Sequence, residues 1–143
     1  MKFLKINILT IFFMIFLFKI NIFAAPLKTY ATYTANNLTI TSYSKSWNKN
    51  MLKNLYVELL NNFHGDEFNY LSNIYIYPDS PEGVNGLYYD NISLENGQYI
   101  LGNKAYINLY NGERYNTIPK IANTLSHEYG HHYMIYNLVK AEN

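Results

Sequence analysis

The sequence predicts an α+β domain that consists of an N-terminal helix, a small set of strands and a C-terminal helix. Apolar residues recur at three- and four-residue steps over 46–63 and again over 118–139, which is the period of a helix with one buried face. Between these stretches lie short runs rich in Tyr and Ile, separated by Gly, Asn and Pro. The chain has 143 residues, which is enough for one domain and too few for two.

Residues 1–24 are predicted to be a secretory signal peptide and not part of the fold. A basic start precedes an apolar run over 8–18, and we expect cleavage after Ala24. The competing interpretation is a membrane anchor, but Lys19 interrupts the run before it reaches the roughly 20 residues that a spanning helix needs. We therefore expect a secreted protein, extracellular or in the cell envelope, with residues 25–143 as its domain and no stable membrane insertion after cleavage.

Charge and composition exclude several classes of partner. Three of the 11 basic residues and none of the 10 acidic residues lie in the predicted signal peptide, so the rest of the chain carries 8 − 10, or about −2 charges. An acidic domain is not expected to bind nucleic acid or an anionic membrane. The absence of cysteine excludes disulfides. We attribute the 16 tyrosines to codon bias in an A+T-rich genome; carbohydrate binding is the alternative, but nothing in the spacing selects it.

The first predicted elements are a strand and a helix. Residues 38–41 alternate between apolar and polar side chains, as a half-buried strand does. Ser46 is expected to cap a helix that runs to about Phe63. Gly65 is expected to close this helix in the left-handed conformation.

The middle of the chain is predicted to contain four further strands. Pro and Gly residues over 78–83 stop the first of them, and Gly102-Asn103 is expected to form a turn between the last two. The predicted strands cover residues 73–77, 86–90, 98–101 and 104–110.

The last predicted element is a helix that begins after Asn116 or Thr117, has Pro119 in its first turn, and continues to Val139 or the end of the chain. Its expected apolar stripe contains Ile118, Ala122, Leu125, Tyr129, Tyr133, Tyr136 and Leu138.

This helix carries an H-E-x-x-H motif over residues 127–131. Two histidines four residues apart leave the same helix face, so the ring nitrogens of His127 and His131 can bind one Zn²⁺ at about 2.0–2.1 Å. Glu128 can reach a water held by the metal and act as a general base. The motif therefore predicts Zn²⁺ as cofactor, His127 and His131 as its ligands and Glu128 as the catalytic residue. The alternative is a helix whose histidines are ordinary surface or half-buried residues.

Residues 124–132 resemble the active-site helix of secreted bacterial zinc peptidases of the gluzincin type, a branch of the zincins. Over the rest of the domain the resemblance is limited to the order of the elements. It implies the N-terminal subdomain of a zincin, with a small mixed sheet over the active-site helix and residues 106–110 as the edge strand that pairs with extended substrate. The implied function is a secreted zinc metalloendopeptidase that hydrolyses peptide bonds of a peptide or protein.

Catalytic zinc needs a third protein ligand. Met134 and Asn137 stand where the extended metzincin motif has glycine and histidine, so that subclass is excluded. In gluzincins the third ligand is a glutamate on a later helix, and Glu142, the only acid after Glu128, is not expected to reach the metal. The resemblance therefore implies a chain that lacks the C-terminal subdomain, an inactive homologue, or a ligand supplied from upstream.

Three acidic or imidazole side chains upstream could supply that ligand, because His64, Asp66 and Glu67 cluster after the first helix. The other interpretation of His64 is a histidine that interacts with the dipole at the helix C-terminus. His132 points about 100° away from His131 and is expected to support the site or lie on the surface. The alternative function is a non-catalytic secreted zincin-like domain, either a decayed enzyme or a binding module.

Two further positions carry expectations. Gly130 lies in the middle of a helix, where glycine costs about 1 kcal/mol relative to alanine, so a small residue there suggests that another group comes close. Asn108, on the strand predicted to be the edge, is expected to be exposed.

Overall fold

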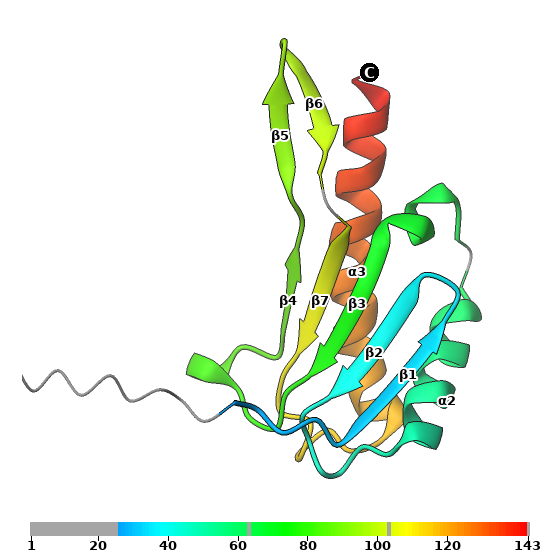
Figure 1. Cartoon of the computed structure of the whole chain (residues 1–143), viewed down its shortest axis with the longest axis vertical. Helices are drawn as coiled ribbons and strands as arrows, with labels where there is room; N and C mark the ends of the chain where they lie inside the picture. The colour runs from blue at the N-terminus through cyan, green and yellow to red at the C-terminus, as the bar shows by residue number, and fades with distance from the viewer. Residues whose placement is uncertain (1–25, 63, 103, 143) are drawn as a thin grey trace, which may run out of the picture.

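The computed structural model describes residues 26–62, 64–102 and 104–142. The predicted signal peptide and its cleavage point lie outside the described residues, as does Phe63. Figure 1 shows a five-stranded sheet, two helices behind it and a two-stranded hairpin beyond one end of the sheet. The predicted α+β class, with a small mixed sheet packed on an N-terminal helix and a C-terminal helix, is confirmed.

The strands of the main sheet lie in the order β1-β2-β3-β7-β4. The three central strands are parallel, and an antiparallel strand flanks them on each side. The bounds are Ala31–Ala35 for β1, Leu38–Ser42 for β2, Leu71–Ile76 for β3, Gly86–Tyr89 for β4 and Ala105–Leu109 for β7.

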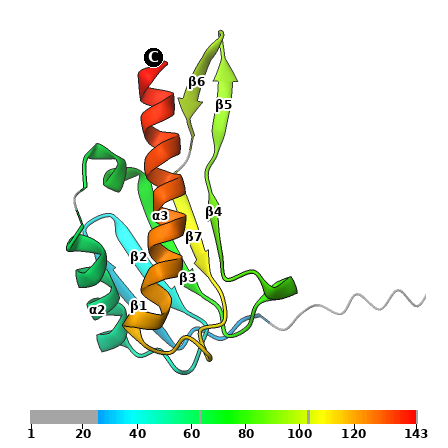
Figure 2. The ribbon, with the colours of Figure 1, turned by 180° about the vertical axis from the view of Figure 1, so that it is seen from behind.

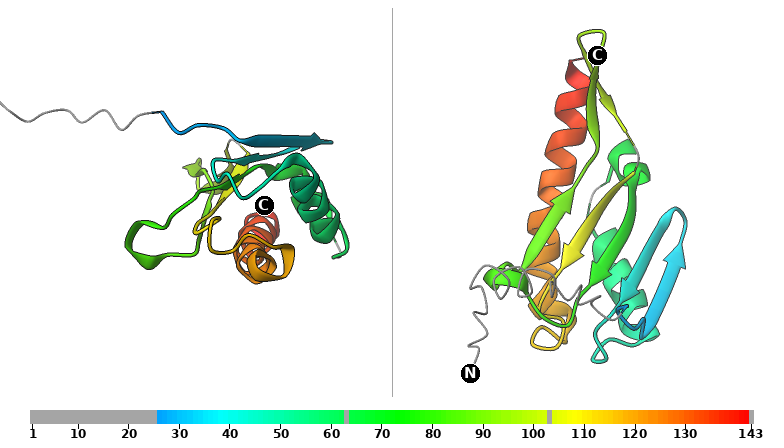
Figure 3. Two further views of the ribbon diagram at one scale, coloured as in Figure 1. Left: turned by 90° about the horizontal axis from the view of Figure 1, so that it is seen from below. Right: turned by 60° about the vertical axis from the view of Figure 1, so that its left-hand side comes forward.

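Both helices cover the same face of this sheet. Figure 3, seen from below, places α2 (Lys49–Leu60) and α3 (Ile118–Ala141) on one side of the strands. Seen from behind in Figure 2, α3 lies over β7 and β4, whereas α2 lies over β1 and β2. No described helix covers the opposite face.

The core forms where the strands turn their alternate side chains toward the helices. Ile40, Ile74 and Ile107 are aligned across the three parallel strands and are fully buried. They pack in one cluster with leucines of α2 and with Leu125 of α3. Burial of such side chains stabilises the fold by about 1.5–3 kcal/mol each, and this packing holds both helices to one face.

The first helix begins later than predicted. Ser46 is not its cap; the side chain of Asn48 accepts a hydrogen bond from the Met51 N–H and starts α2 there. Ser46 instead donates its hydroxyl to Glu113, which also accepts the Lys45 N–H. This hydrogen bond from Ser46 is the largest cause of a lowered pKa at the Glu113 carboxyl. The segment before α2 is therefore held by a residue on the loop after β7.

The same helix also ends earlier than predicted, at Leu60 with Asn61 as its C-cap. Gly65 is not left-handed; its φ is −110° and it begins the short 3-10 helix η1 (Asp66–Tyr70). His64 Nε2 lies 2.6 Å from the carbonyl oxygen of Leu59. A carbonyl only accepts, so the His64 ring donates to the last turn of α2, as the interpretation of His64 as a helix-end histidine requires.

The strand predicted to be the edge is an interior strand. Residues 106–110 belong to β7, which pairs with β3 on one side and with β4 on the other. The edge next to α3 is β4, because the chain returns antiparallel after η2 (Pro81–Gly83) and places β4 outside β7. This return is a long-range pairing that local periodicity does not encode.

The turn predicted at Gly102-Asn103 does not join two paired strands, and Asn103 lies outside the described residues. The hairpin is formed instead by β5 (Ile92–Glu95) and β6 (Gln98–Leu101). Asn96 and Gly97 connect them with φ values of 53° and 81°, the left-handed pair that an Asn-Gly turn favours. In Figure 3 this hairpin stands beside the C-terminal half of α3, which β6 contacts.

The last helix begins after Thr117 with a proline in its first turn, as predicted, but its buried stripe differs from the prediction. Tyr133 and Leu138 are exposed, whereas Glu128 and His132 are buried. No helix among the described residues is long and apolar enough to cross a membrane.

The packing of α2 predicts that two of its leucines differ in how much they contribute to stability. Leu55 is 0% exposed and Leu60 is 43% exposed on the same helix. Leu55→Ala should lower the free energy of unfolding by about 2–5 kcal/mol because it leaves a cavity, and Leu60→Ala by less than about 1 kcal/mol. Urea denaturation followed by circular dichroism measures both. Equal losses in the two variants would contradict the arrangement of α2.

Candidate functional site

The two motif histidines converge on the surface of α3. Their Nε2 atoms lie 3.1 Å apart, and their rings are almost perpendicular, with an interplanar angle of 89°. Both side chains are exposed. The one-turn spacing of His127 and His131 therefore places two ring nitrogens at a single point that is open to solvent.

This geometry fits a shared metal ion. Two nitrogens that are each about 2.0–2.1 Å from one Zn²⁺ lie about 3.3 Å apart in a tetrahedral site. The separation between His127 Nε2 and His131 Nε2 is close to that value. In the structure one of these two ring nitrogens donates a hydrogen bond to the other. His127 and His131 are thus two candidate zinc ligands.

Glu128 lies beside this pair and is buried between α3 and the edge strand β4. A Cβ atom added to Gly86, the first residue of β4, would lie 2.7 Å from Glu128 Oε1 and 2.7 Å from Thr124 Cγ2. Real Cβ atoms essentially never come this close, so a side chain at this position would force Glu128 and Thr124 to shift. Gly86 therefore permits the close approach of β4 to the Glu128 side chain.

Of the upstream residues considered as a third ligand, His64 and Glu67 are hydrogen-bonded to other groups, and Asp66 is exposed at the start of η1. His64 Nδ1 lies 2.7 Å from the hydroxyl of Tyr129, which donates to the Glu67 carboxylate at 3.1 Å. Tyr129 is two residues from each motif histidine, which places it roughly 160° around the helix from them. Among residues 26–62, 64–102 and 104–142 no group of three His, Cys, Asp or Glu side chains is arranged to hold a metal.

Glu67 is a buried carboxylate that accepts several hydrogen bonds. Burial raises its pKa, but hydrogen bonds from the backbone N–H of Gly65 and from the Tyr129 hydroxyl outweigh that effect, so the pKa of Glu67 lies below its ordinary value. Conversely, burial and the neighbouring Glu67 charge raise the pKa of Tyr129. Glu67 is therefore charged and Tyr129 is neutral, which matches the direction of the hydrogen bond between them.

His132 does not lie on the surface, since it is only 2% exposed. Its Nε2 lies 2.8 Å from the backbone carbonyl of Glu67, so this nitrogen carries the proton and donates. Its Nδ1 then accepts from the Tyr88 hydroxyl at 3.2 Å. Burial, the main cause, lowers the pKa of His132 despite the nearby Glu67, in agreement with a neutral ring. His132 thus ties α3 both to η1 and to β4.

No match is found when the chain is compared with protein-family models, with curated proteins or with solved structures. The function is therefore inferred from the site itself.

The sequence does not predict how the motif is positioned. Glu67 is considered there only as a metal ligand, Gly86 and Tyr88 carry no motif of their own, and the roles of all three depend on which strand lies at the edge and on where η1 packs. The sequence contains one indication of the role of His132. It directly follows the motif, and a histidine that faces the core needs a hydrogen-bond partner for each ring nitrogen. The sequence could not name those partners.

Alanine substitutions at the two glycines close to Glu128, Gly130 and Gly86, are expected to change the free energy of unfolding in opposite directions. At Gly130 an added Cβ meets no described atom within 4 Å, contrary to the expectation of a close neighbour, so Gly130→Ala should raise the free energy of unfolding by about 0.5–1 kcal/mol. Gly86→Ala should lower it by about 1–3 kcal/mol, because the methyl group collides with Glu128 and Thr124.

Chemical denaturation of the two variants beside the unchanged protein measures both effects. If Gly130→Ala is the less stable of the two, a further group contacts Gly130 and the described packing of α3 is incomplete.

Proposed function

We propose that the protein is a secreted zinc-dependent metallopeptidase in which His127 and His131 bind Zn²⁺ and Glu128 is the general base. The observation that carries this proposal is the convergence of the two Nε2 atoms, 3.1 Å apart on an exposed surface, beside a buried carboxylate. Exposed histidines leave room for a metal and a substrate, whereas the buried Glu128 is held in place. If His127 and His131 were ordinary surface residues, nothing would require the adjacent Glu128 to be buried against Gly86 of the neighbouring strand.

When bound, zinc lowers the pKa of a water ligand and polarises a carbonyl group. Glu128 supplies the other half of the chemistry, because its carboxylate can accept a proton from the attacking water and return it to the leaving amine. Its enclosure against Gly86 and Thr124 restricts the directions in which this carboxylate points. The chain thereby holds the proton acceptor at a fixed place relative to the two histidines.

The edge strand β4 supports a peptide as the substrate. One side of β4 pairs with β7, and its other side lies at the margin of the sheet, next to Glu128. An extended peptide can add to such an edge through main-chain hydrogen bonds, which bind many sequences with little regard for side chains. Because β4 and not β7 is the edge strand, the strand that we expect to pair with substrate is the one whose Gly86 lies close to Glu128 of the motif.

A second candidate function is a non-catalytic secreted domain of the same architecture. It is favoured by one observation: the described residues offer two ligands, His127 and His131, where catalytic zinc takes three. Zinc affinity and hydrolysis distinguish the two candidates, because a binding domain has no need of the general base.

The first prediction concerns zinc binding. The purified protein, dialysed against a weak chelator, should bind one Zn²⁺, as measured by metal analysis and by titration against a competing chelator. His131→Ala should lower the affinity by more than the roughly 10–100-fold that follows the loss of a ligand's hydrogen-bond partner. Asn137→Ala, an exposed change on the same helix, is the matched control and should bind as before. Unchanged zinc affinity in His131→Ala would contradict the proposed metal site.

The second prediction concerns the general base. Glu128→Gln should reduce hydrolysis of an unfolded protein substrate by about 10²–10⁴-fold, because glutamine cannot accept the proton, while zinc affinity is retained. Glu142→Gln makes the same substitution at an exposed position near the end of α3 and should leave hydrolysis unchanged. Persistent hydrolysis by Glu128→Gln contradicts the mechanism. Tight zinc binding without hydrolysis in the unchanged protein selects the non-catalytic alternative.

A further inference from the structure

The helix-free face of the sheet carries a cluster of tyrosines, which we call the tyrosine face. Its rings form three stacked pairs, with centroids 4.7–6.2 Å apart and interplanar angles of 13–27°. Further tilted and edge contacts join the pairs into one array. The tyrosine face consists of Tyr43, Tyr75, Tyr77, Tyr89, Tyr106 and Tyr110.

Strand alternation gathers these rings on one side. In β3, Ile74 and Ile76 face the helices, so Tyr75 and the following Tyr77 face the other way. The same alternation in β7 turns Ile107 and Leu109 inward, so that Tyr106, Asn108 and the following Tyr110 face outward. Codon bias, the explanation that we favour for the number of tyrosines, would not account for their collection on one face in stacked pairs.

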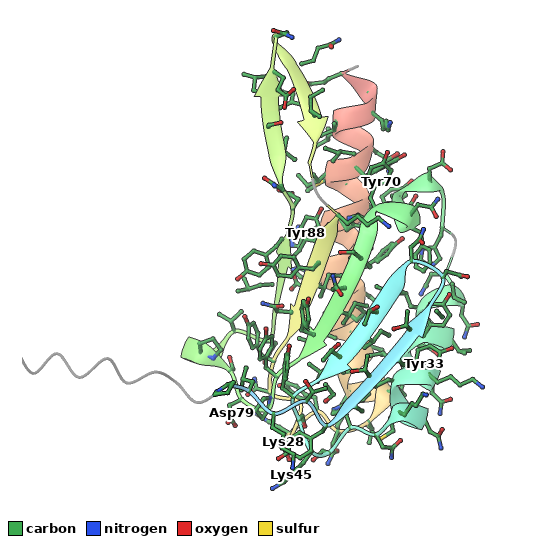
Figure 4. The ribbon with its side chains drawn as sticks, viewed as in Figure 1. Lys28, Tyr33, Lys45, Tyr70, Asp79 and Tyr88 are labelled. Carbon is green, nitrogen blue, oxygen red and sulfur yellow. The ribbon has the colours of Figure 1, made fainter. Side chains whose placement is uncertain are left out.

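A hollow of about 490 Å³ opens at the end of the tyrosine face where β3 ends. The stacked rings of Tyr77 and Tyr110 form one part of its wall, and Pro78, Asp79 and Asn108 form another. Figure 4 shows Asp79 at this end of the sheet. The volume lies within the range of about 300–1,000 Å³ that is typical of small-ligand sites, and aromatic walls with a few polar groups are also typical of them.

Asn108 contributes an acceptor without a partner. The residue is 8% exposed, so the expectation that it is exposed is wrong. Its Nδ2 donates to the Tyr110 hydroxyl at 3.2 Å, whereas its Oδ1 has no hydrogen-bond partner among the described residues. Buried polar groups are nearly always paired, and an unpaired carbonyl oxygen is costly. The side-chain oxygen of Asn108, in the wall of the hollow, can therefore accept a hydrogen bond from a donor that the described residues do not provide.

The chemistry of the hollow disfavours an anionic ligand and is compatible with a neutral one that carries hydroxyl groups. Asp79 is the one charged side chain among the residues that line it, and no lysine or arginine is there to bind phosphate or sulfate groups. Burial raises the pKa of Tyr77 to about 12, so this phenol is uncharged at physiological pH. A saccharide offers apolar C–H faces for the tyrosine rings and hydroxyl donors for the amide and carboxylate oxygens.

We propose that the tyrosine face and its hollow bind a neutral saccharide, with the Tyr77 ring, backed by the buried ring of Tyr110, as the stacking surface and Asn108 as a hydrogen-bond acceptor. The face lies on the side of the sheet opposite to α3, so a saccharide bound there leaves His127 and His131 accessible. The proposal does not rest on the peptidase proposal: it needs neither zinc nor Glu128.

The test is affinity electrophoresis of the purified protein through gels that contain hydroxyethylcellulose, galactomannan or glycogen. At least one of these neutral polysaccharides should retard the protein. Tyr77→Ala should abolish the retardation, because it removes the ring that lies in the wall. Tyr133→Ala, which removes an exposed ring from α3, is the matched control and should migrate like the unchanged protein. Circular dichroism establishes that both variants are folded.

A second measurement avoids substitution. Titration of the unchanged protein with the hexasaccharide of the retarding polymer should shift the side-chain amide signals of Asn108 in a ¹⁵N-correlated spectrum. Ring signals of Tyr77 and Tyr110 should shift in an aromatic ¹³C-correlated spectrum. The proposal is overturned if no polysaccharide retards the protein, or if Tyr133→Ala loses retardation as Tyr77→Ala does. It is also overturned if a proline-rich peptide shifts these signals and the hexasaccharide does not.

Discussion

The hydrogen bond from His132 to the backbone carbonyl of Glu67 fixes the rotation of α3, and the candidate site depends on that rotation. Adjacent residues of a helix diverge by about 100°, so once His132 is held in the core, His131 must point toward solvent. The Tyr88 hydroxyl holds the other nitrogen of the same ring from the edge strand. A helix held only by apolar contacts could turn by a fraction of a residue at little cost, whereas a buried and fully paired imidazole permits one orientation.

The buried polar groups of α3 join it to two other parts of the fold. Tyr129 links the helix to Glu67 and to His64, which itself closes the last turn of α2. Glu128 faces β4, where Gly86 admits it. The helix is therefore bound on one side to the N-terminal helix and on the other to the edge of the sheet. The exposed surface that carries the two motif histidines is what remains between these connections.

The parts of the fold that follow from local patterns could be predicted, and the parts that follow from long-range pairing could not. Both helices and most strands were visible in the spacing of apolar residues, and Thr117 was identified as a possible start of the last helix. Asn96-Gly97 is a local hairpin signal that the predicted strands do not include, although its sequence favours a two-residue turn. The position of β4 outside β7 has no local signature. At the site, the motif placed His127 and His131 together, but the spacing of apolar residues assigned Tyr133 to the core and left out His132, because polar residues with buried partners do not follow that spacing.

The lengths of the elements have a mechanical consequence. The last helix has 24 residues, about 36 Å, whereas strands of the main sheet have four to six residues, about 13–20 Å. The sheet therefore supports only part of α3, and the β5–β6 hairpin lies beside the rest. The contacts of Gly86 and Tyr88 with α3 fall at the motif, within the part that the sheet supports. Fraying of the final turns can thus proceed without displacing the two histidines, so this continuous helix has an inner part held by the sheet and an outer part held by the hairpin and η1.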